Sequence, residues 1–446
     1  MDIAVPLPAS PPRVCVLSHA HPDFSKGGGE IAAYRQHQAQ RAAGWRSIFV
    51  SAADLKIGGQ GMPSATPYAP DEFLFAFSRM AEDRLSWEDA YQRRALVRFL
   101  AGLEVDVYHF HHYWRIGLDL IADLMDARPD ATFVITLHEM LAICLHHGQM
   151  IKTRGRELCR TESPVRCLSC FPDLTIDRML LRKAYMLKGL QRFDHVIYCS
   201  EFLRDRFEAW GLASSAGSVL ENYLGDEMLA MPRPAPSGTN AHRFAFFGQP
   251  TAFKGLDILL RAMALIPKPK RASAPVPSLT IFGAEQADVL RLFPDLAPVM
   301  EELGTAVTMA GRYDPADVVE LMQSVGWVIV PSIWWENSPV VIQEARRAGT
   351  PLIVSNIGGM AEKVVDGRDG MHFRRSSTTD LARVLQQAAE PAFRAKMAAS
   401  VHDVIEREEF LQGLSLAYQP TARVRAAVAQ ARLREDGPQS VSLAAI

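Results

Sequence analysis

The chain has 446 residues, of which 48% are hydrophobic and 22% charged, and its net charge at pH 7 is −2. This length exceeds what one small hydrophobic core serves, so we expect two domains. The nearly balanced charge argues against a nucleic-acid-binding protein, which usually carries a basic excess.

No apolar run approaches the roughly 18 residues of a membrane-spanning helix, and the opening MDIAVPLPASPP lacks the pattern of a secretory signal. We therefore expect a cytoplasmic protein, with association at the inner face of the membrane as an open alternative. The six cysteines fit a reducing compartment better than a disulfide framework: Cys15, Cys144, Cys159, Cys167, Cys170 and Cys199.

Short apolar runs alternate with amphipathic segments in the first half of the chain. The runs are predicted to be buried strands: RVCVLS (13–18), SIFVS (47–51), DVYHF (106–110), TFVITL (132–137) and DHVIYCS (194–200). Strands separated by helices pair in parallel. We predict an α/β, doubly wound, Rossmann-like domain over residues 1–230, with a cysteine-containing insertion at 140–175.

A segment rich in Pro, Ser, Gly and Asn, MPRPAPSGTNAH (231–242), predicts a linker. The alternation then restarts, with strands predicted at 243–248, 278–283, 306–311, 327–332 and 351–355, and helices beginning near Gly255, Asp314, Ser338 and Thr378. We predict a second Rossmann-like domain over 243–405. A helix at 406–433 is expected to pack back on the first domain, a surface loop at 268–277, and a flexible tail at 434–446.

In open parallel sheets, ligands bind beyond the carboxyl ends of the strands, so two facing sheets form a cleft between domains. At one such end lies PSIWWENSPVVIQEARRAG, in which seven residues separate Glu336 from Glu344. Ser338 is a good N-cap, Pro339 a good first helical residue, and Gly349 a good helix end.

The amino end of a helix suits a phosphate group, and Glu344 lies roughly 8–9 Å deeper along the helix axis than that end. This arrangement suits a nucleotide sugar, which carries hydroxyls on both sides of a diphosphate. The other interpretation is an ordinary strand–helix turn with Glu344 on a solvated face.

Together these segments resemble the retaining glycosyltransferases of family 4, of the bacterial surface-polysaccharide type, over about residues 13–420. The resemblance implies the GT-B fold, with two Rossmann-like domains facing across a cleft. It implies that Glu336 contacts the transferred sugar and that Glu344 holds the ribose hydroxyls. The segment FFGQPTAFKG (246–255) resembles the donor loop of the family, so Lys254 is expected to neutralise the leaving diphosphate.

This chain departs from many relatives in having Gln249 where they have an arginine, and Arg312 is the candidate to supply that charge. Gly311-Arg312-Tyr313 resembles the loop that frames the base. The remaining donor-binding residues that the resemblance implies are Gly28, Gly29, Gly248, Gln249, Arg312, Tyr313, Asn337, Ser338, Pro339 and Val340.

Three histidines lie at the end of DVYHFHHYW (106–114). Family 4 has a His-x-His motif at this place, which points to His111 near the reacting sugar and leaves the roles of His109 and His112 open. A metal triad is the rival interpretation, but the adjacent His111 and His112 would point to opposite faces of a strand. TLHEM (136–140) ends the next strand, and we expect His138 and Glu139, with His112, on the acceptor side.

Cys144, Cys159, Cys167 and Cys170 have the spacing C-x14-C-x7-C-x2-C. Four thiols that include a CxxC pair suit a structural zinc ion, and free or redox-active thiols are the alternative. The segment 177–193 mixes basic residues with Leu and Met, so it is either a helix on an anionic membrane surface or an ordinary scaffold helix.

The resemblance implies a hexosyltransferase of class EC 2.4 that moves a sugar from a uridine or guanosine diphosphate donor to a hydroxyl acceptor, without a cofactor or catalytic metal. The acceptor is expected to be a saccharide, above all a lipid-linked one in bacterial polysaccharide or lipopolysaccharide synthesis. A nucleotide-sugar epimerase on the same frame and a non-catalytic sugar-nucleotide-binding protein are the other function classes. No nucleic-acid partner is expected.

Overall fold

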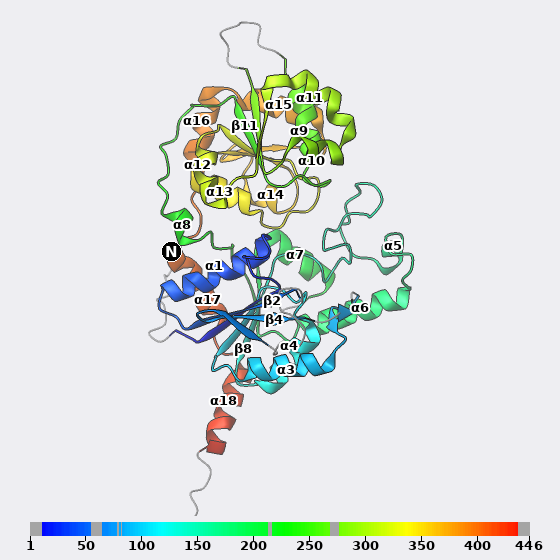
Figure 1. The fold of residues 1–446 in the computed structure, drawn as a ribbon, viewed down its shortest axis with the longest axis vertical. Coiled ribbons are helices and arrows are strands. Elements are labelled where there is room, and N and C mark those ends of the chain that lie inside the picture. Colours follow the sequence, from blue (N-terminus) through cyan, green and yellow to red (C-terminus); the bar gives the residue numbers. More distant parts are fainter. Residues whose placement is uncertain are drawn as a thin grey trace, which may run out of the picture.

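The protein consists of two lobes, one above the other, joined by an extended segment (Figure 1). The structure is a computed structural model that describes residues 11–54, 65–77, 80–81, 83–212, 216–267 and 276–435. Most of the predicted loop 268–277 and nearly all of the predicted tail 434–446 lie outside the described residues.

The first lobe is built on an eight-stranded sheet with the strand order β10-β9-β8-β7-β1-β2-β4-β3. The strands are β1 (Val14–Ser18), β2 (Ser47–Ala53), β3 (Thr66–Ala69), β4 (Glu72–Ala76), β7 (Val107–Phe110), β8 (Thr132–Leu137), β9 (His195–Tyr198) and β10 (Gly217–Val219). The neighbouring strands pair in parallel except at one edge, where β3 is antiparallel to β4. The expectation of a purely parallel sheet is therefore wrong at this edge.

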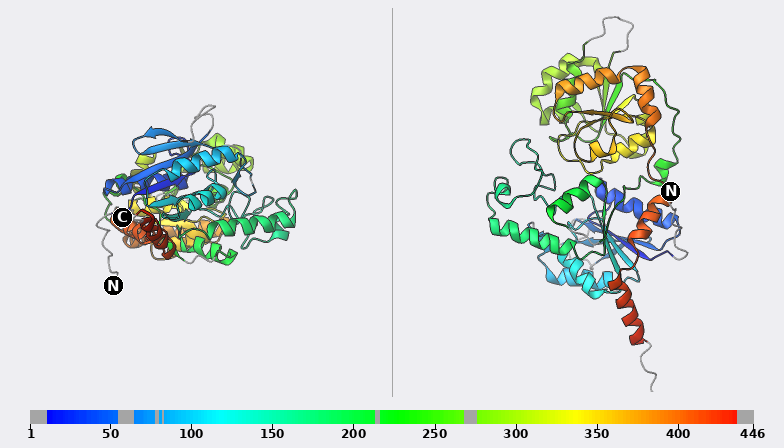
Figure 2. Two further views of the ribbon diagram at one scale, coloured as in Figure 1. Left: turned by 90° about the horizontal axis from the view of Figure 1, so that it is seen from below. Right: turned by 180° about the vertical axis from the view of Figure 1, so that it is seen from behind.

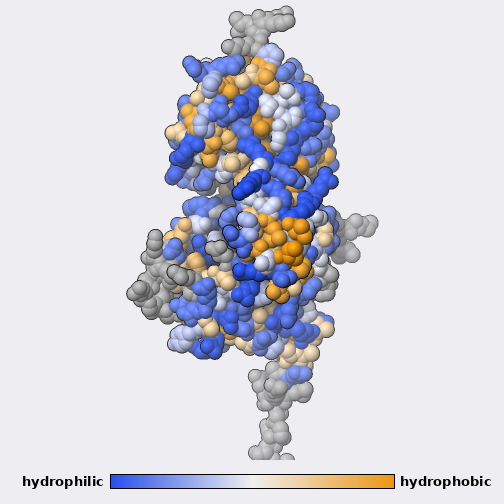
Figure 3. Space-filling model, turned by 90° about the vertical axis from the view of Figure 1, so that its right-hand side faces the viewer, coloured by the Kyte–Doolittle hydropathy of each residue, from blue (hydrophilic) through white to orange (hydrophobic). Residues whose placement is uncertain are grey.

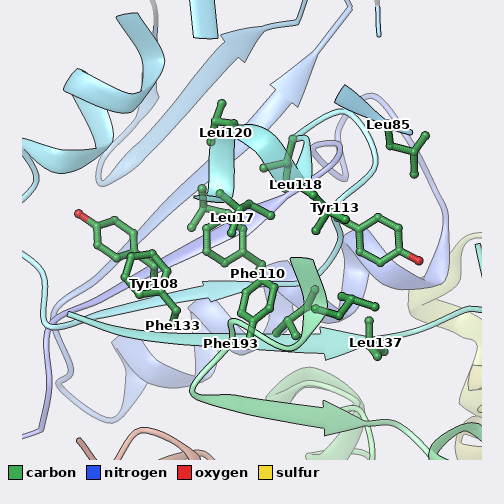
Figure 4. Close-up of a cluster of buried hydrophobic side chains, with 14 of the residues drawn as sticks. Leu17, Leu85, Tyr108, Phe110, Tyr113, Leu118, Leu120, Phe133, Leu137 and Phe193 are labelled. Atoms are coloured by element: carbon green, nitrogen blue, oxygen red, sulfur yellow. The ribbon is translucent and has the colours of Figure 1, made fainter. Parts of the chain in front are cut away.

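Seven described helices belong to this lobe: α1 (Gly28–Ala42), α3 (Ala90–Ala101), α4 (Leu118–Ala127), α5 (Pro164–Cys167), α6 (Ile176–Leu190), α7 (Glu201–Trp210) and α8 (Asp226–Leu229). A small hairpin, β5 (Met80–Ala81) with β6 (Ser86–Trp87), lies apart from the main sheet. The strands carry apolar side chains on both faces because helices cover both faces. Figure 4 shows one such layer, in which Tyr108 and Phe110 pack with Phe133.

The second lobe has a six-stranded parallel sheet with the order β13-β12-β11-β14-β15-β16. Its strands are β11 (Arg243–Phe247), β12 (Ser278–Phe282), β13 (Val307–Gly311), β14 (Trp327–Val330), β15 (Leu352–Ser355) and β16 (Gly370–Phe373). Its helices are α9 (Leu256–Ala264), α10 (Gln286–Leu292), α11 (Ala297–Leu303), α12 (Val318–Gln323), α13 (Val340–Ala348), α14 (Gly358–Lys363), α15 (Thr378–Ala388) and α16 (Pro391–Ser400).

Helix α13 begins one residue later than its sequence suggests. Pro339 is the N-cap, with an extended backbone, and Val340 is the first helical residue. The prediction that Ser338 caps the helix is therefore wrong, and its hydroxyl is buried without a hydrogen-bond partner among the described residues. The predicted end is confirmed, since Gly349 adopts a left-handed conformation at φ 69°.

The chain returns to the first lobe after the second sheet. Helix α17 (Arg407–Ala417) places Phe410, Leu411 and Leu414 in a buried cluster with residues of β1, β7 and β8. Helix α18 (Ala422–Glu435) follows and extends away from the lobe (Figures 1 and 2). The prediction of one continuous helix is wrong because Pro420 separates the two, and proline cannot donate the backbone hydrogen bond that a helix interior needs.

Tyr418, next to the end of α17, links this returning segment to the first lobe. Its hydroxyl lies 2.6 Å from His109 Nδ1, 3.0 Å from Gln36 Nε2 and 3.1 Å from Gln40 Nε2, and the side chain is buried. We expect Tyr418→Phe to lower the free energy of unfolding by about 1–3 kcal/mol, because it leaves buried polar groups without a partner. Chemical denaturation measures this loss, and the exposed Tyr91→Phe is the control. Equal stability of the two variants would contradict this role.

Each of the described helices is too short or too polar to cross a bilayer.

Candidate functional site

A cavity of about 990 Å³ has lining residues from both lobes. From the first lobe, Gly28 and Gly29 line it at the start of α1; from the second, Ser338 and Val340 line it at the start of α13. A Cβ atom placed on Gly28 would lie 3.9 Å from Val340 Cγ2, so the two helix starts approach each other closely. Two positive helix ends therefore meet at this cavity, which favours an anionic ligand there.

The start of α1 is held in shape by Glu30. One of its carboxylate oxygens accepts hydrogen bonds from the Gly27 amide, at 2.7 Å, and from the Ser25 hydroxyl. The other oxygen lies 3.4 Å from His19 Nε2, beyond hydrogen-bond geometry but within ion-pair range. Gly28 and Gly29, which lie between Gly27 and Glu30 in this turn, line the cavity.

Lys254 and Glu336 form a direct ion pair in the second lobe, with Nζ 2.6 Å from Oε1. The same oxygen accepts hydrogen bonds from Ser332 Oγ at 2.8 Å and Trp334 Nε1 at 2.9 Å. Burial opposes ionisation of Glu336, but Lys254 and these donors outweigh it, so its pKa is lowered and the carboxylate is charged. No described residue donates a hydrogen bond to Oε2 of this carboxylate.

The loop at Gly358 and Gly359 closes over the backbone of this pair. The Gly359 amide donates to the Glu336 carbonyl at 2.7 Å. A Cβ on Gly359 would lie 1.7 Å from the Asn337 carbonyl oxygen, so only glycine fits there. The segment that resembles the family's Gly-Gly loop thus fixes the position of Glu336.

Glu344 lies on α13, deeper than the helix start, and it is partly buried. Burial raises its pKa to about 7, and the guanidinium of Arg35, from α1 of the other lobe, opposes part of that rise. The charge of Glu344 also adds to the effect of burial in raising the pKa of Tyr313 to about 12. Glu344 therefore faces the junction of the lobes, and the interpretation that it lies on a solvated face is wrong.

His111 lies one layer behind the wall of the cavity. Its side chain is buried, with Nδ1 3.0 Å from His138 Nε2 and Nε2 3.0 Å from Gln36 Oε1. It does not line the cavity, whereas His138 and His112 do. His109 is fully buried one step further back, hydrogen-bonded to Gln36 and Thr136. Of His109, His111 and His138, only His138 lines the cavity. His111 holds the His138 ring from behind through the hydrogen bond between them.

This arrangement separates the expected effects of two substitutions. We expect His138→Ala to lower kcat/KM by about tenfold or more, the usual effect of losing a positioned polar group, with little loss of stability. We expect His111→Ala to lower the unfolding temperature, because it leaves buried groups of Gln36 and His138 unpaired. Steady-state kinetics and thermal unfolding of both variants test this, and a reversed pattern would place His111 at the substrate.

Glu139 and His112 form the wall of the cavity next to His138. Glu139 Oε1 accepts a hydrogen bond from the Tyr113 hydroxyl at 3.1 Å and lies 3.4 Å from His112 Nε2. Burial raises the pKa of Glu139 to about 7 and lowers that of His138 to about 4. Glu139 and His138 both line the cavity, and the lowered pKa keeps His138 neutral at physiological pH.

Apart from Ser338 and Val340 at the start of α13, the expected donor-binding residues of the second lobe do not line the large cavity, and neither do Lys254 and Glu336. Asn337 Nδ2 donates to the His138 carbonyl across the lobes at 3.0 Å, and its Oδ1 is buried without a partner among the described residues. Tyr313 packs edge-on against Phe247 and Phe282 at the ends of β11 and β12. Gln249 and Arg312 are exposed, and Gly248 has a positive φ of 137°.

The insertion at 140–175 reaches the second lobe beside the Lys254–Glu336 pair. Arg156 Nη1 lies 2.9 Å from Asp257 Oδ2, and Trp335 Nε1 donates to the Cys159 carbonyl at 3.0 Å. His146 stacks edge-on with Phe253, next to Lys254. The insertion therefore bridges the lobes at one side of the site.

The four cysteines of this insertion line one small cavity of about 30 Å³: Cys144, Cys159, Cys167 and Cys170. All four are free thiols. As placed, no three His, Cys, Asp or Glu side chains within the described ranges are arranged to hold a metal ion. The zinc interpretation remains a prediction, and metal analysis of the purified protein tests it.

Sequence reasoning missed several cavity residues of the first lobe, namely His19, Glu30, Trp114, Arg115 and Asn222. His19 directly follows β1, so its place at a carboxyl strand end was a usable signal. Trp114 and Arg115 stack on each other, with the guanidinium carbon 4.4 Å from the ring centroid, in a loop whose course the sequence does not indicate.

Comparison with known proteins places both lobes in glycosyltransferase families. Residues 26–222 match the family model described as Glycosyltransferase Family 4, and residues 232–400 match Glycosyl transferases group 1. The chain is 32% identical over 331 residues to a D-inositol 3-phosphate glycosyltransferase of Corynebacterium aurimucosum, covering 70% of each chain. It is 24% identical to glycogen synthase of Mycobacterium tuberculosis, over 87% of this chain and 88% of that one. A match to a D-inositol 3-phosphate glycosyltransferase of Stackebrandtia nassauensis, 31% identical, covers only 41% of this chain and 42% of that relative.

Solved structures resemble the whole chain. Sucrose-phosphate synthase from Thermosynechococcus elongatus superposes with a TM-score of 0.62 at 17% identity, over 95% of this chain and 99% of that one. HepE of Anabaena, in complex with UDP, superposes with a TM-score of 0.60 at 18% identity, over 95% and 100%. The two facing Rossmann-like sheets have the GT-B arrangement. The protein is therefore a glycosyltransferase, a member of family 4 with the GT-B fold.

Proposed function

We propose that the protein transfers a hexosyl group, with retention of the anomeric configuration, from a nucleoside diphosphate sugar to a hydroxyl of a lipid-linked saccharide. The observation that carries the proposal is the Lys254–Glu336 pair just before α13, with Glu344 further along the same helix. Such a donor carries a diphosphate between two groups that bear hydroxyls, the sugar and the ribose. Lys254 and the start of α13 suit the diphosphate, and Glu336 and Glu344 suit the hydroxyls on its two sides.

Each of these groups has a place in the reaction. The bond between the anomeric carbon and the diphosphate oxygen breaks, and negative charge grows on the leaving diphosphate. Lys254 Nζ and the amides at the start of α13 stabilise that charge. The acceptor oxygen bonds to the anomeric carbon from the same face, and its proton passes to the departing phosphate oxygen.

The carboxylates and imidazoles orient the donor and the acceptor. Glu336 accepts a hydrogen bond from a sugar hydroxyl through Oε2, the oxygen to which no described residue donates. Glu344 accepts hydrogen bonds from the ribose hydroxyls. His138, supported by His111, and Glu139 contact the sugar and the acceptor from the first lobe.

A uridine diphosphate hexose is the first donor to test, because the HepE structures contain UDP and UDP-glucose. Tyr313, packed on Phe247 and Phe282, supplies an aromatic surface for the base. The exposed Arg312 directly precedes Tyr313 in the chain, where it would supply the positive charge that Gln249 lacks.

An acceptor with a lipid part is supported by the apolar wall of the cavity. Besides polar residues such as Asp83, Arg115 and Asp173, the cavity is lined by the apolar side chains of Phe77, Met80, Leu85, Trp114, Phe171, Pro172 and Leu174. A wall of this kind suits a hydrocarbon chain better than a second sugar. The relatives named for inositol phosphate and glycogen make a soluble acceptor the natural comparison.

A donor screen tests the proposal. Release of nucleoside diphosphate is measured for uridine, guanosine and adenosine diphosphate sugars, with three acceptors: a polyprenyl-linked saccharide, inositol phosphate and a maltooligosaccharide. We expect release from one donor to rise at least tenfold with the polyprenyl-linked saccharide. We also expect no effect of EDTA, because fixed protein charges stabilise the leaving group.

Proton NMR of the product distinguishes the outcomes. The proposal predicts the anomeric coupling of the donor in the new glycoside. An inverted product would exclude retention. Conversion of the donor to an epimer without an acceptor would identify an isomerase, and a preference for a soluble acceptor would remove the lipid part of the proposal.

A further inference from the structure

An exposed apolar surface lies on α5 and α6, on the face of the first lobe that Figure 3 presents. Val165 on α5 is 66% exposed, and on α6 Leu180 and Leu181 are 50% and 69% exposed, with Ile176 at the helix start also exposed. We call these four residues the α5–α6 patch. Figure 3 shows a large hydrophobic area on this side, next to the junction of the lobes.

The leucines of the patch are not needed to hold α6 in place. The helix is anchored by Met179, Met186 and Leu190, which are buried at helical spacing on its inner face. The buried Arg182 also fixes it, donating to the carbonyls of Leu141 and Ala142. Leu180 and Leu181 therefore remain on the outer face, which costs solvation free energy unless another surface covers them.

The segment that carries the patch has an excess of positive charge. Residues 151–193 contain ten Lys and Arg against four Asp and Glu, although the whole chain has a net charge of −2. Five of the ten are in ion pairs, Arg156 with Asp257, Arg166 with Glu157, Arg178 with Asp83, Lys183 with Glu162 and Arg192 with Asp126, and Arg182 is buried. Arg154, Arg160 and Lys188 are exposed, and Lys188 lies on α6 itself. Exposed aliphatic side chains on a segment with exposed cations suit an anionic lipid surface, where apolar side chains enter the acyl boundary and cations meet the headgroups.

The patch is also connected to the site. Phe171, Pro172 and Leu174, which line the apolar wall of the large cavity, directly precede α6. Met80 and Leu85, which also line the cavity, belong to the β5–β6 hairpin, and the Arg178–Asp83 ion pair ties this hairpin to α6. The start of α6 thus links the patch to the apolar lining of the cavity.

We propose that the α5–α6 patch docks the enzyme on an anionic phospholipid bilayer, with the apolar end of the cavity facing the lipid. The link to an acceptor chain rests on the proposed function, whereas the docking itself does not. A protein partner is disfavoured because the patch is aliphatic, while protein interfaces are centred on aromatic side chains.

Vesicle flotation tests the docking directly. The full chain is mixed with vesicles of phosphatidylcholine alone or with 30% phosphatidylglycerol, a composition chosen for the test, at low and high salt. We expect partition onto the anionic vesicles, loss of binding at high salt, and about tenfold weaker partition for Leu180→Ser/Leu181→Ser. The matched control is Leu265→Ser/Leu292→Ser, two exposed leucines of the second lobe, which should bind as the unmodified protein does.

Each result of the flotation test either supports or overturns the proposed membrane docking. No partition onto anionic vesicles, or equal loss in both double variants, overturns the proposal. A dimer in solution that Leu180→Ser/Leu181→Ser dissociates, without vesicle binding, assigns the patch to a protein contact instead. Because flotation needs no turnover, a failure of the donor screen leaves this result standing. Conversely, donor turnover without flotation refutes only the docking.

Discussion

Replacing Lys254 with alanine is expected to lower kcat by about 10²–10³-fold, the effect of removing one preorganised group that stabilises developing negative charge. Lys254 Nζ lies 2.6 Å from Oε1 of Glu336, and Glu336 precedes α13 in the chain. A diphosphate at the start of α13 would therefore meet the ammonium group of Lys254. Steady-state measurement of nucleoside diphosphate release gives the result. Lys254→Arg keeps the charge and should recover part of the rate.

The exposed Lys396→Ala, in the same lobe, is the control for loss of a lysine. Circular dichroism of Lys254→Ala must show a folded protein, because the substitution leaves the buried Glu336 without its cation. A kcat within threefold of the unmodified enzyme would remove Lys254 from the leaving-group role.

Glu344→Gln is expected to have opposite effects on donor binding and on stability. The amide is a weaker acceptor for ribose hydroxyls than a carboxylate, so KM for the donor should rise about tenfold or more at pH 8. Because burial raises the folded-state pKa of Glu344 to about 7, above its ordinary value, the ionised carboxylate destabilises the fold.

The sign of the pH dependence follows from that shift. A raised carboxyl pKa means that the folded state binds the proton more tightly, so stability falls as pH rises from the ordinary value through about 7. Glu344→Gln should therefore be more stable than the unmodified enzyme by about 2 kcal/mol at pH 8, allowing for partial solvent access, and by less at pH 5.5. Urea unfolding at both pH values measures this, with the exposed Glu320→Gln as control. An unchanged KM together with unchanged stability would show that Glu344 faces solvent.

The sequence predicted those elements whose signal is local. The buried strands of both sheets and the left-handed end of α13 at Gly349 follow from short apolar runs and from glycine chemistry. The spacing of Glu336 and Glu344 was enough to place both near one helix start. The edge strand β3, its neighbour β4 and the β5–β6 hairpin were missed because their pairing depends on the surrounding structure.

The order of the histidines required the three-dimensional structure. His109, His111 and His138 come from two neighbouring strands, and which of them reaches the cavity depends on how Gln36 of α1 packs between the first two. The same is true of the insertion, whose contact from Arg156 to Asp257 joins residues 101 positions apart. Contacts over such distances in the chain leave no periodic signal in the sequence.

A crystal structure with bound uridine diphosphate or guanosine diphosphate tests the central claim most directly. The account predicts diphosphate density between Lys254 Nζ and the amides at the start of α13, with the ribose hydroxyls within hydrogen-bond distance of Glu344. Diphosphate density outside the junction of the lobes, or a ribose turned away from Glu344, would contradict it.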